Sequence, residues 1–101
     1  MITKFKLFEE KWNKETGSYV IMTEPGDREK DIAIRNFLEN NIGKITKMFY
    51  PGAWFNVEYD NIPSNIKKYL ENKDFNSAYI LHISKNKEDL EPYIALKKYN
   101  L

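Results

Sequence analysis

Residues 47–60, KMFYPGAWFNVEYD, are the most aromatic stretch of the chain, and they place two strand-like segments around a Pro-Gly. In the second segment apolar and polar residues alternate, which is typical of a strand with one buried face. The core face of this strand holds Phe55, Val57 and Tyr59. The opposite face holds Trp54, Asn56, Glu58 and Asp60. The stretch therefore predicts a hairpin in which Trp54 lies on the polar side.

The register of this hairpin stays open at this stage. A four-residue loop over 50–53 pairs Phe49 with Trp54, whereas a three-residue loop places Tyr50 beside Trp54. An L-Pro-Gly turn does not match the twist of a tight two-residue hairpin, so the turn does not choose between them. In either register Trp54 has an aromatic neighbour. That face either packs under the C-terminal tail or the first hairpin, through Trp12, or it binds a partner.

The rest of the chain supplies further strands and two helices. Alternation over 3–9 and β-branched residues over 18–23 predict a first hairpin. A helix from Asp27, as its cap, to Asn41 is predicted to bury Ile34, Phe37 and Leu38. Its other side, with Asp31, Arg35 and Glu39, is predicted to be a solvated face, and Gly43 is predicted to stop the helix.

The last third predicts a second helix and two more strands. The helix begins near Pro63 and ends near Asp74, with an apolar face of Ile62, Ile66, Tyr69 and Leu70. Residues 78–83 are apolar on both faces, as in a central strand. We expect residues 93–99 to form a final strand, because Pro92 would interrupt a helix begun near Asn86. A C-terminal helix that starts close to Pro92 is the alternative.

These elements predict an α+β fold in one domain, 1–101. The expected order is ββαββαββ, with a largely antiparallel sheet of five to six strands and both main helices on one face. That arrangement buries every apolar stripe of the sequence.

Composition excludes several classes of function. The chain has no cysteine, which excludes disulfides, thiolate metal sites and cysteine nucleophiles. The net charge is +1, from 16 basic and 15 acidic residues, and only Arg28 and Arg35 are arginine. This balance is typical neither of an acidic DNA mimic nor of a strongly basic nucleic-acid binder.

The apolar residues of the first ten positions alternate with lysines, so we expect no signal peptide, and no segment approaches the ~20 apolar residues of a membrane span. We therefore expect a cytoplasmic protein that does not associate with membranes. The excess of Lys, Asn, Ile and Tyr is typical of AT-rich codons and indicates an AT-rich genome, such as that of a low-GC bacterium, a phage or a virus. Together with the small size and the lack of catalytic motifs, it favours a phage or mobile-element protein, in which case the location is the host cytoplasm.

No catalytic, cofactor or metal motif is recognisable. His82 is the only histidine, and neither an orienting acid nor a nucleophile accompanies it in the sequence. Glu58 and Asp60 share a strand face and suit Mg²⁺ or Ca²⁺, but such pairs are usually solubilising. The glycines form no phosphate-binding loop. We therefore expect neither a cofactor nor a metal, and a protein that is not an enzyme.

The leading hypothesis is a small protein-binding domain that inhibits or modulates a host protein, of the anti-defence type. Its predicted contact residues are Trp54, Phe49, Tyr50, Lys47, Asn56 and Glu58. The alternative is a single-stranded DNA or RNA binder that stacks bases on an aromatic and lysine-bearing sheet face. Its predicted phosphate contacts are Lys4, Lys6, Lys44 and Lys47, which lie alongside Phe5, Phe8, Phe49 and Trp54. A third hypothesis is a ligand site or enzyme around His82. A homodimer through an exposed edge strand is also compatible with the sequence.

Overall fold

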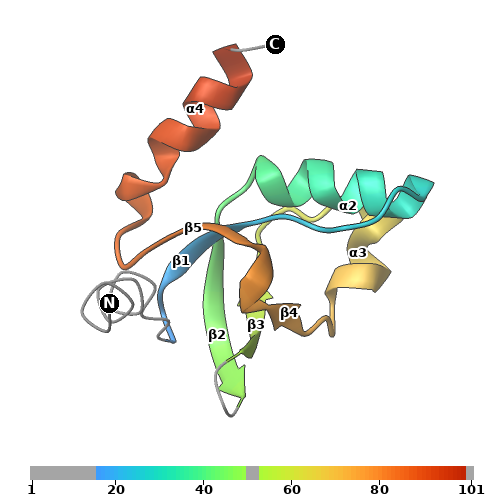
Figure 1. Cartoon of the computed structure of the whole chain (residues 1–101), viewed down its shortest axis with the longest axis horizontal. Helices are drawn as coiled ribbons and strands as arrows, with labels where there is room; N and C mark the ends of the chain where they lie inside the picture. Colours follow the sequence, from blue (N-terminus) through green and yellow to red (C-terminus); the bar gives the residue numbers. More distant parts are fainter. Residues whose placement is uncertain (1–15, 50–52, 100–101) are drawn as a thin grey trace, which may run out of the picture.

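The computed structural model describes residues 16–49 and 53–99, and it shows an α+β fold (Figure 1). The predicted class is confirmed. In chain order the elements are β1 (Tyr19–Met22), α2 (Glu29–Glu39), β2 (Gly43–Phe49), β3 (Trp54–Glu58), α3 (Ser64–Leu70), β4 (Phe75–Asn76), the 3₁₀ turn η1 (Ser77–Tyr79), β5 (Ile80–Ser84), the 3₁₀ turn η2 (Lys87–Asp89) and α4 (Glu91–Tyr99).

The five strands form one antiparallel sheet in the order β4-β3-β2-β1-β5. β4 and β5 lie at the two ends of that order, yet only the three residues of η1 separate them in the chain. A 3₁₀ helix rises ~2 Å per residue, so η1 spans about 6 Å. The two ends of the sheet must therefore approach each other, and the sheet curls into a partly closed barrel.

Backbone hydrogen bonds hold η1 to both sides of this closure. The Ser77 N–H donates to the Ala53 carbonyl, immediately before β3, at 2.8 Å. The Thr23 N–H, immediately after β1, donates to the Tyr79 carbonyl at 3.0 Å. The start of β3 and the end of β1 are thus brought to opposite ends of one short turn.

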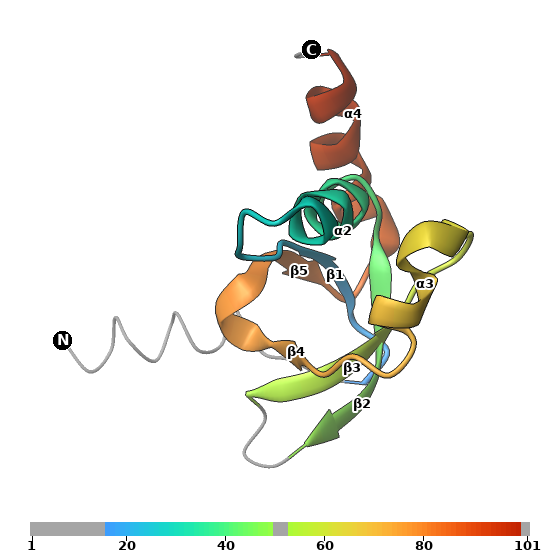
Figure 2. The same cartoon turned by 90° about the vertical axis from the view of Figure 1, so that its right-hand side faces the viewer.

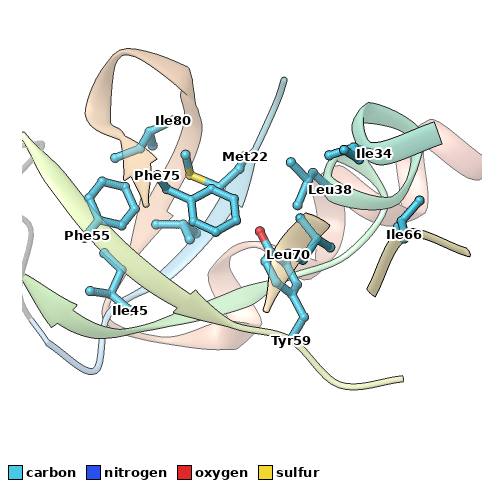
Figure 3. Packing of buried hydrophobic residues seen from close by; sticks show 11 residues of the cluster. Met22, Ile34, Leu38, Ile45, Phe55, Tyr59, Ile66, Leu70, Phe75 and Ile80 are labelled. Atoms are coloured by element: carbon cyan, nitrogen blue, oxygen red, sulfur yellow. The ribbon is translucent and has the colours of Figure 1, made fainter. Parts of the chain in front are cut away.

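The core lies between the curled sheet and both predicted helices (Figure 3). α2 contributes Ile34 and Leu38, and α3 contributes Ile66 and Leu70. Both helices therefore cover the same face of the sheet, as the apolar stripes predict. From the sheet the buried cluster takes Val20, Met22, Ile45, Phe55, Tyr59, Phe75 and Ile80.

Two predictions about individual elements need correction. Residues 93–99 belong to helix α4, because Pro92 is the second residue of that helix, where a missing N–H costs nothing. β5 is an end strand rather than a central one, and Leu81 is exposed on it. Within the described residues β1 pairs with β2 and β5; the predicted strand at 3–9 lies outside them, as does Trp12.

The polar face predicted for the first helix is not a solvated one. Arg28, rather than Asp27, is the N-cap, and its backbone N–H donates to Asp31 at 3.2 Å. Asp31 is only 6% exposed. Burial alone would raise the pKa of the Asp31 carboxyl, but hydrogen bonds from the side chain and backbone of Arg28 outweigh it and hold the pKa below its usual range.

Gly43 starts β2 and does not end α2, which stops at Glu39. This position has no room for a side chain, since a Cβ here would lie 2.3 Å from Val57 Cγ1 and 2.6 Å from Tyr59 Cζ. The Tyr59 ring lies over this glycine, between Phe37 and Phe75, with ring centroids 5.4 and 6.2 Å away. The Tyr59 hydroxyl is buried without a hydrogen-bond partner.

Gly43→Ala should lower the free energy of unfolding by about 1–3 kcal/mol, because the new methyl group overpacks the Tyr59 site. Urea unfolding monitored by circular dichroism measures this. Gly17→Ala is the comparison, since Gly17 has a φ of +95° but open space around it, and its cost is backbone strain of ~1 kcal/mol. A Gly43→Ala protein as stable as wild type would contradict the packing described here.

Tyr59→Phe should raise the free energy of unfolding by about 1 kcal/mol, because it removes a buried hydroxyl that has no partner. Burial also raises the pKa of the Tyr59 phenol above its ordinary value of 10.0. The folded state therefore loses stability as the pH rises past the unfolded pKa, near 10, and the Tyr59→Phe advantage should widen there. Urea unfolding at neutral and alkaline pH tests both points. A loss of stability on Tyr59→Phe would show that the hydroxyl has a partner.

Candidate functional site

The hairpin of β2 and β3 places Phe49 directly opposite Trp54. This is the register with the four-residue loop, and it excludes the three-residue alternative. A bulge between Ile45 and Lys47 produces it. Ile45 and Met48 both face the core on either side of the bulge, so that Lys47 and Phe49 are turned to the face of Trp54. Trp54 is 46% exposed.

The other predicted contact residues lie at different distances from this aromatic pair: Lys47 and Asn56 are the next residues on its face of the hairpin, and Glu58 is four residues beyond Trp54 on β3. The Lys47 Nζ lies 5.2 Å from the centroid of the Phe49 ring, a cation–π contact. Glu58 is exposed and lies opposite Lys44. The Asn56 amide is already used, because it donates to the Lys73 carbonyl and to Asp74 Oδ1, both at 3.1 Å. Tyr50 lies outside the described residues.

Trp54 also lines a groove that the sequence analysis missed. The groove has a volume of about 200 Å³ and runs between the start of β3, the segment after β1 and η1. Its floor includes the buried side chains of Met22 and Phe75. The rest of its lining includes the half-buried Glu24 and Lys73 and the exposed Pro25, Trp54, Asp74 and Tyr79.

Tyr79 was missed because residues 78–83 were predicted to be one continuous strand. In the structure the strand is broken at η1, where the Asn76 side chain accepts a hydrogen bond from the Ala78 N–H at 2.8 Å. This bond turns the chain and leaves the Tyr79 ring 38% exposed. The Asn-Ser pair at 76–77 is the sequence signal for such a turn.

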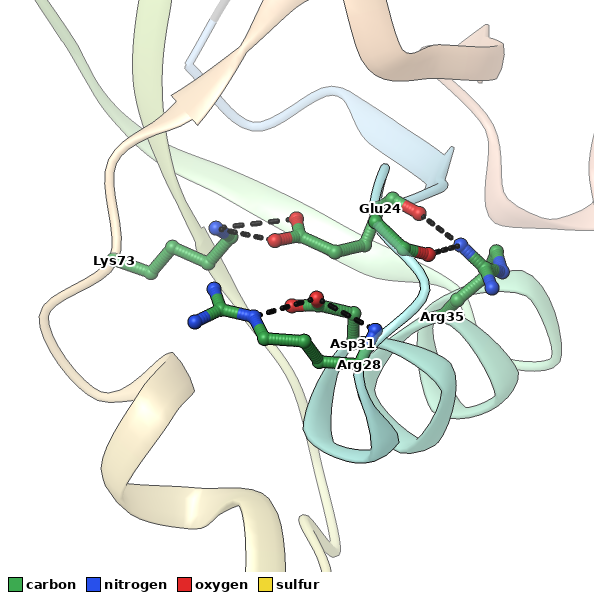
Figure 4. Close-up of polar contacts among 6 residues, drawn as sticks. Glu24, Arg28, Asp31, Arg35 and Lys73 are labelled. Carbon is green, nitrogen blue, oxygen red and sulfur yellow. Dashed lines mark hydrogen bonds and ion pairs between the residues drawn. The ribbon is translucent and has the colours of Figure 1, made fainter.

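The rim of the groove is fixed to α2 and to the segment before β4 (Figure 4). Arg35 on α2 donates through one nitrogen to the Glu24 carbonyl at 2.7 Å and to the Gly26 carbonyl at 2.8 Å. The Glu24 carboxylate pairs with Lys73 at 3.2 Å. The Glu24–Lys73 pair joins two residues that are 49 positions apart in the sequence. Together with the Arg35 bonds it fixes the shape of the groove.

Gly26 allows the rim to pass close over Asp31. It has a φ of +111°, and a Cβ there would lie 2.5 Å from Asp31 Oδ2. A side chain at this position would therefore displace the carboxylate that caps α2. Arg35 and Asp31, predicted to be surface charges, are instead the supports of the 24–26 segment.

His82 is packed against an aromatic ring of α4. Its ring stacks on Tyr93 of α4, with centroids 3.7 Å apart, and burial lowers its pKa. Ser84 and Asp89 lie nearby, but the Ser84 hydroxyl donates to Asp89 at 2.5 Å instead of to the histidine. Ser84 also accepts from the Asn86 N–H, so the group shapes the turn that leads to η2. A nucleophile needs a base within hydrogen-bonding reach, and here the serine is bonded to the acid.

A larger hollow of about 680 Å³ lies between the end of α2, the loop before α3 and α4. The amides of Asn40 and Asn41 on its wall are bonded to the carbonyls of Asn36 and Phe37 of their own helix. Asp60, Asn61, Lys87 and Glu91 also line the hollow. Within 16–49 and 53–99 no three potential metal ligands gather, and no described helix is long and apolar enough to cross a membrane.

Helix α4 extends away from the sheet and past α2 (Figure 2), and a charged contact ties it to the body. Lys97 pairs with Glu39 of α2, and Glu39 also accepts from the Thr23 hydroxyl at 2.5 Å. Burial alone would raise the pKa of the Glu39 carboxyl. The hydrogen bonds from Lys97 and Thr23 outweigh burial, so the pKa lies below the ordinary 4.5.

Comparison with known proteins finds no match for this chain among protein-family models, curated proteins or solved structures.

Glu39→Gln should lower the free energy of unfolding by about 1 kcal/mol at neutral pH. Because the folded pKa of Glu39 is depressed, its contribution is present above the unfolded pKa and is lost as the pH falls through the folded one. The difference between the two proteins should therefore shrink as the pH falls below 4.5 and vanish below the folded pKa of Glu39. Urea unfolding across this range measures it, with Glu71→Gln at an exposed site as control. A difference that persists in acid would mean that the carboxylate charge is not what holds α4.

Proposed function

We propose that this chain is a non-enzymatic protein-binding domain and that Trp54 anchors its contact surface. The observation that carries this proposal is the setting of the Trp54 ring. Nearly half of it is exposed, yet its backbone is fixed between β2 and β4 in the sheet. A rigid, exposed tryptophan contributes a large apolar area to a contact and loses little entropy on binding.

The surroundings of Trp54 have the make-up of an interface centre. Phe49 stands beside it on the hairpin, and Tyr79, the last residue of η1, lines the same groove. Tryptophan and tyrosine are enriched among the residues that contribute most binding energy at protein interfaces. Lys47, Glu58 and Asp74 supply charges of both signs at the rim, as protein contacts usually have.

The charges beside Trp54 favour a protein over a nucleic acid. Glu24 and Asp74 both line the groove next to the indole ring, and their carboxylates would repel phosphates. Of the four lysines that the alternative hypothesis uses, the two within the described residues lie near aromatic rings. Lys44 lies 6.0 Å from the centroid of Tyr19, and Lys47 lies over Phe49.

The biological setting that we propose is inhibition or modulation of a host protein by a phage or mobile-element protein in the host cytoplasm. Support for it comes from the small size, the absence of cysteine and the AT-rich residue usage. The unpaired side of β5 leaves room for a homodimer by strand pairing, since β5 pairs only with β1 within the described chain.

Trp54→Ala should abolish capture of the partner. Purified wild-type protein and the variant are immobilised and exposed to nuclease-treated lysate of the host species, and captured proteins are identified by mass spectrometry. Tyr69→Ala is the matched control, because Tyr69 is an exposed aromatic residue on α3, outside the groove. The proposal requires a protein that wild type and Tyr69→Ala retain and Trp54→Ala loses. Equal capture by all three would overturn it, and sedimentation of each protein reports any homodimer.

Single-stranded DNA and RNA of mixed sequence should leave the tryptophan fluorescence unchanged at low and moderate salt. Salt-sensitive quenching that disappears in Trp54→Ala would contradict the protein-binding proposal and identify the hairpin as a stacking platform for bases.

A further inference from the structure

The Trp54–Tyr79 groove has a shape that selects among peptide conformations. A volume of about 200 Å³ holds a few side chains, whereas a helix with its side chains is ~10–12 Å across. The exposed rings of Trp54 and Tyr79 line the groove together with the pyrrolidine ring of Pro25. The site therefore favours an extended segment that presents compact apolar groups.

The backbone around the groove is not available for strand addition. Ser77 N–H is bonded to the Ala53 carbonyl, and the Tyr79 carbonyl accepts from Thr23 N–H. The Ala78 N–H is occupied by the Asn76 side chain. An incoming β-strand gains its affinity from free main-chain donors and acceptors, and η1 offers few of them here.

What the groove does offer is side-chain donors. Within the described residues neither the Trp54 indole N–H nor the Tyr79 hydroxyl donates a hydrogen bond, and both rings are exposed. A polyproline II segment has no internal hydrogen bonds, so its carbonyls point outward, and its prolines carry no N–H. Aromatic rings with free donors suit such a segment, because each ring can pack on a proline and bond to a carbonyl.

The charge of the lining adds a preference for one kind of flanking residue. Two carboxylates, Glu24 and Asp74, and one ammonium group, Lys73, give a net charge of −2 + 1 = −1. Lys73 is paired with Glu24. The Asp74 carboxylate is exposed and accepts only the Asn56 amide, so it can pair with an additional cation.

We infer that this groove binds a proline-rich, extended segment of the partner protein, with a lysine or arginine of that segment beside Asp74. The inference rests on the proposed protein-binding function and names the chemistry that the partner presents. Binding of this kind needs no rearrangement of the chain, since Arg35 and the Glu24–Lys73 pair already hold the rim in place.

Fluorescence anisotropy of a dye-labelled oligoproline peptide that ends in a pair of arginines tests the inference. A Gly-Ser peptide of equal length and charge is the control for simple electrostatic attraction. We expect saturable binding of the proline peptide only. Tyr79→Ala should weaken it by about tenfold or more, as expected for loss of an interface anchor. Asp74→Asn should weaken the arginine-ended peptide but not one that ends in glutamines.

Tyr69→Ala is the matched variant, because Tyr69 is an exposed aromatic residue on α3 that does not line the groove. It should bind the proline peptide as wild type does. Circular dichroism of each variant checks folding, and Tyr79→Phe, which keeps the ring and removes only the hydroxyl, gives a second reading if Tyr79→Ala unfolds. It should weaken binding less than Tyr79→Ala.

Two results would overturn the inference. One is absence of binding by the wild type; the other is equal binding of the Gly-Ser peptide. The proposed function fails separately, because it is measured by Trp54-dependent capture of a protein. A partner that Trp54→Ala loses but Tyr79→Ala retains would leave the protein-binding function standing and remove the groove as its site.

Discussion

The chain has three residues in which to pass from one end of its sheet to the other, and the rest of the structure depends on that limit. Because η1 is so short, β4 and β5 must come together, and the sheet must curl around one side of the core. The curl brings the start of β3 next to the end of β1. Trp54, Pro25 and Tyr79, which are far apart in sequence, become neighbours for this reason alone.

Charged residues hold the rim of the groove in place. Arg35 is half-buried against the carbonyls of the 24–26 segment, and Asp31 lies beneath Gly26. Each of these charges is satisfied by hydrogen bonds, which is the condition under which burying a charge is tolerable. The groove is thus shaped before any partner arrives, and this reduces the entropy lost on binding.

Local pattern predicted most elements correctly because each has a clear apolar period. Alternation located β3, and the stripe of Ile34 and Leu38 located α2. The errors arose where tertiary context decides. Pro92 breaks a helix only if the helix begins well before it, and nothing local shows that α4 begins at Glu91. Likewise, the helical pattern predicts that Asp31 lies on the surface. In the structure the preceding loop covers it and leaves it buried.

For a related reason the sequence predicted Trp54 as part of the candidate site but not the groove that Trp54 lines. Trp54 and Phe49 lie in one hairpin, so strand alternation limited the neighbour of Trp54 to Phe49 or Tyr50. The structure decides for Phe49, through the bulge between Ile45 and Lys47. The groove combines residues from three segments that only sheet closure brings together, and no local pattern contains Pro25, Trp54 and Tyr79 at once. The sequence analysis did not predict the 3₁₀ turn at 77–79, which connects the two end strands of the sheet. A continuous strand over 78–83 does not indicate that the sheet closes there.

Helix α4 is joined to the body by few contacts: the stack of Tyr93 on His82, the Lys97–Glu39 pair and the buried Leu90 that precedes the helix. One of these three is an ion pair that salt weakens, and none belongs to the sheet ladder. The molecule therefore has two levels of cooperativity. The backbone amides of α4 exchange with solvent through local opening, at a free energy well below that of global unfolding, while the amides of β1 and β2 exchange only when the whole barrel opens.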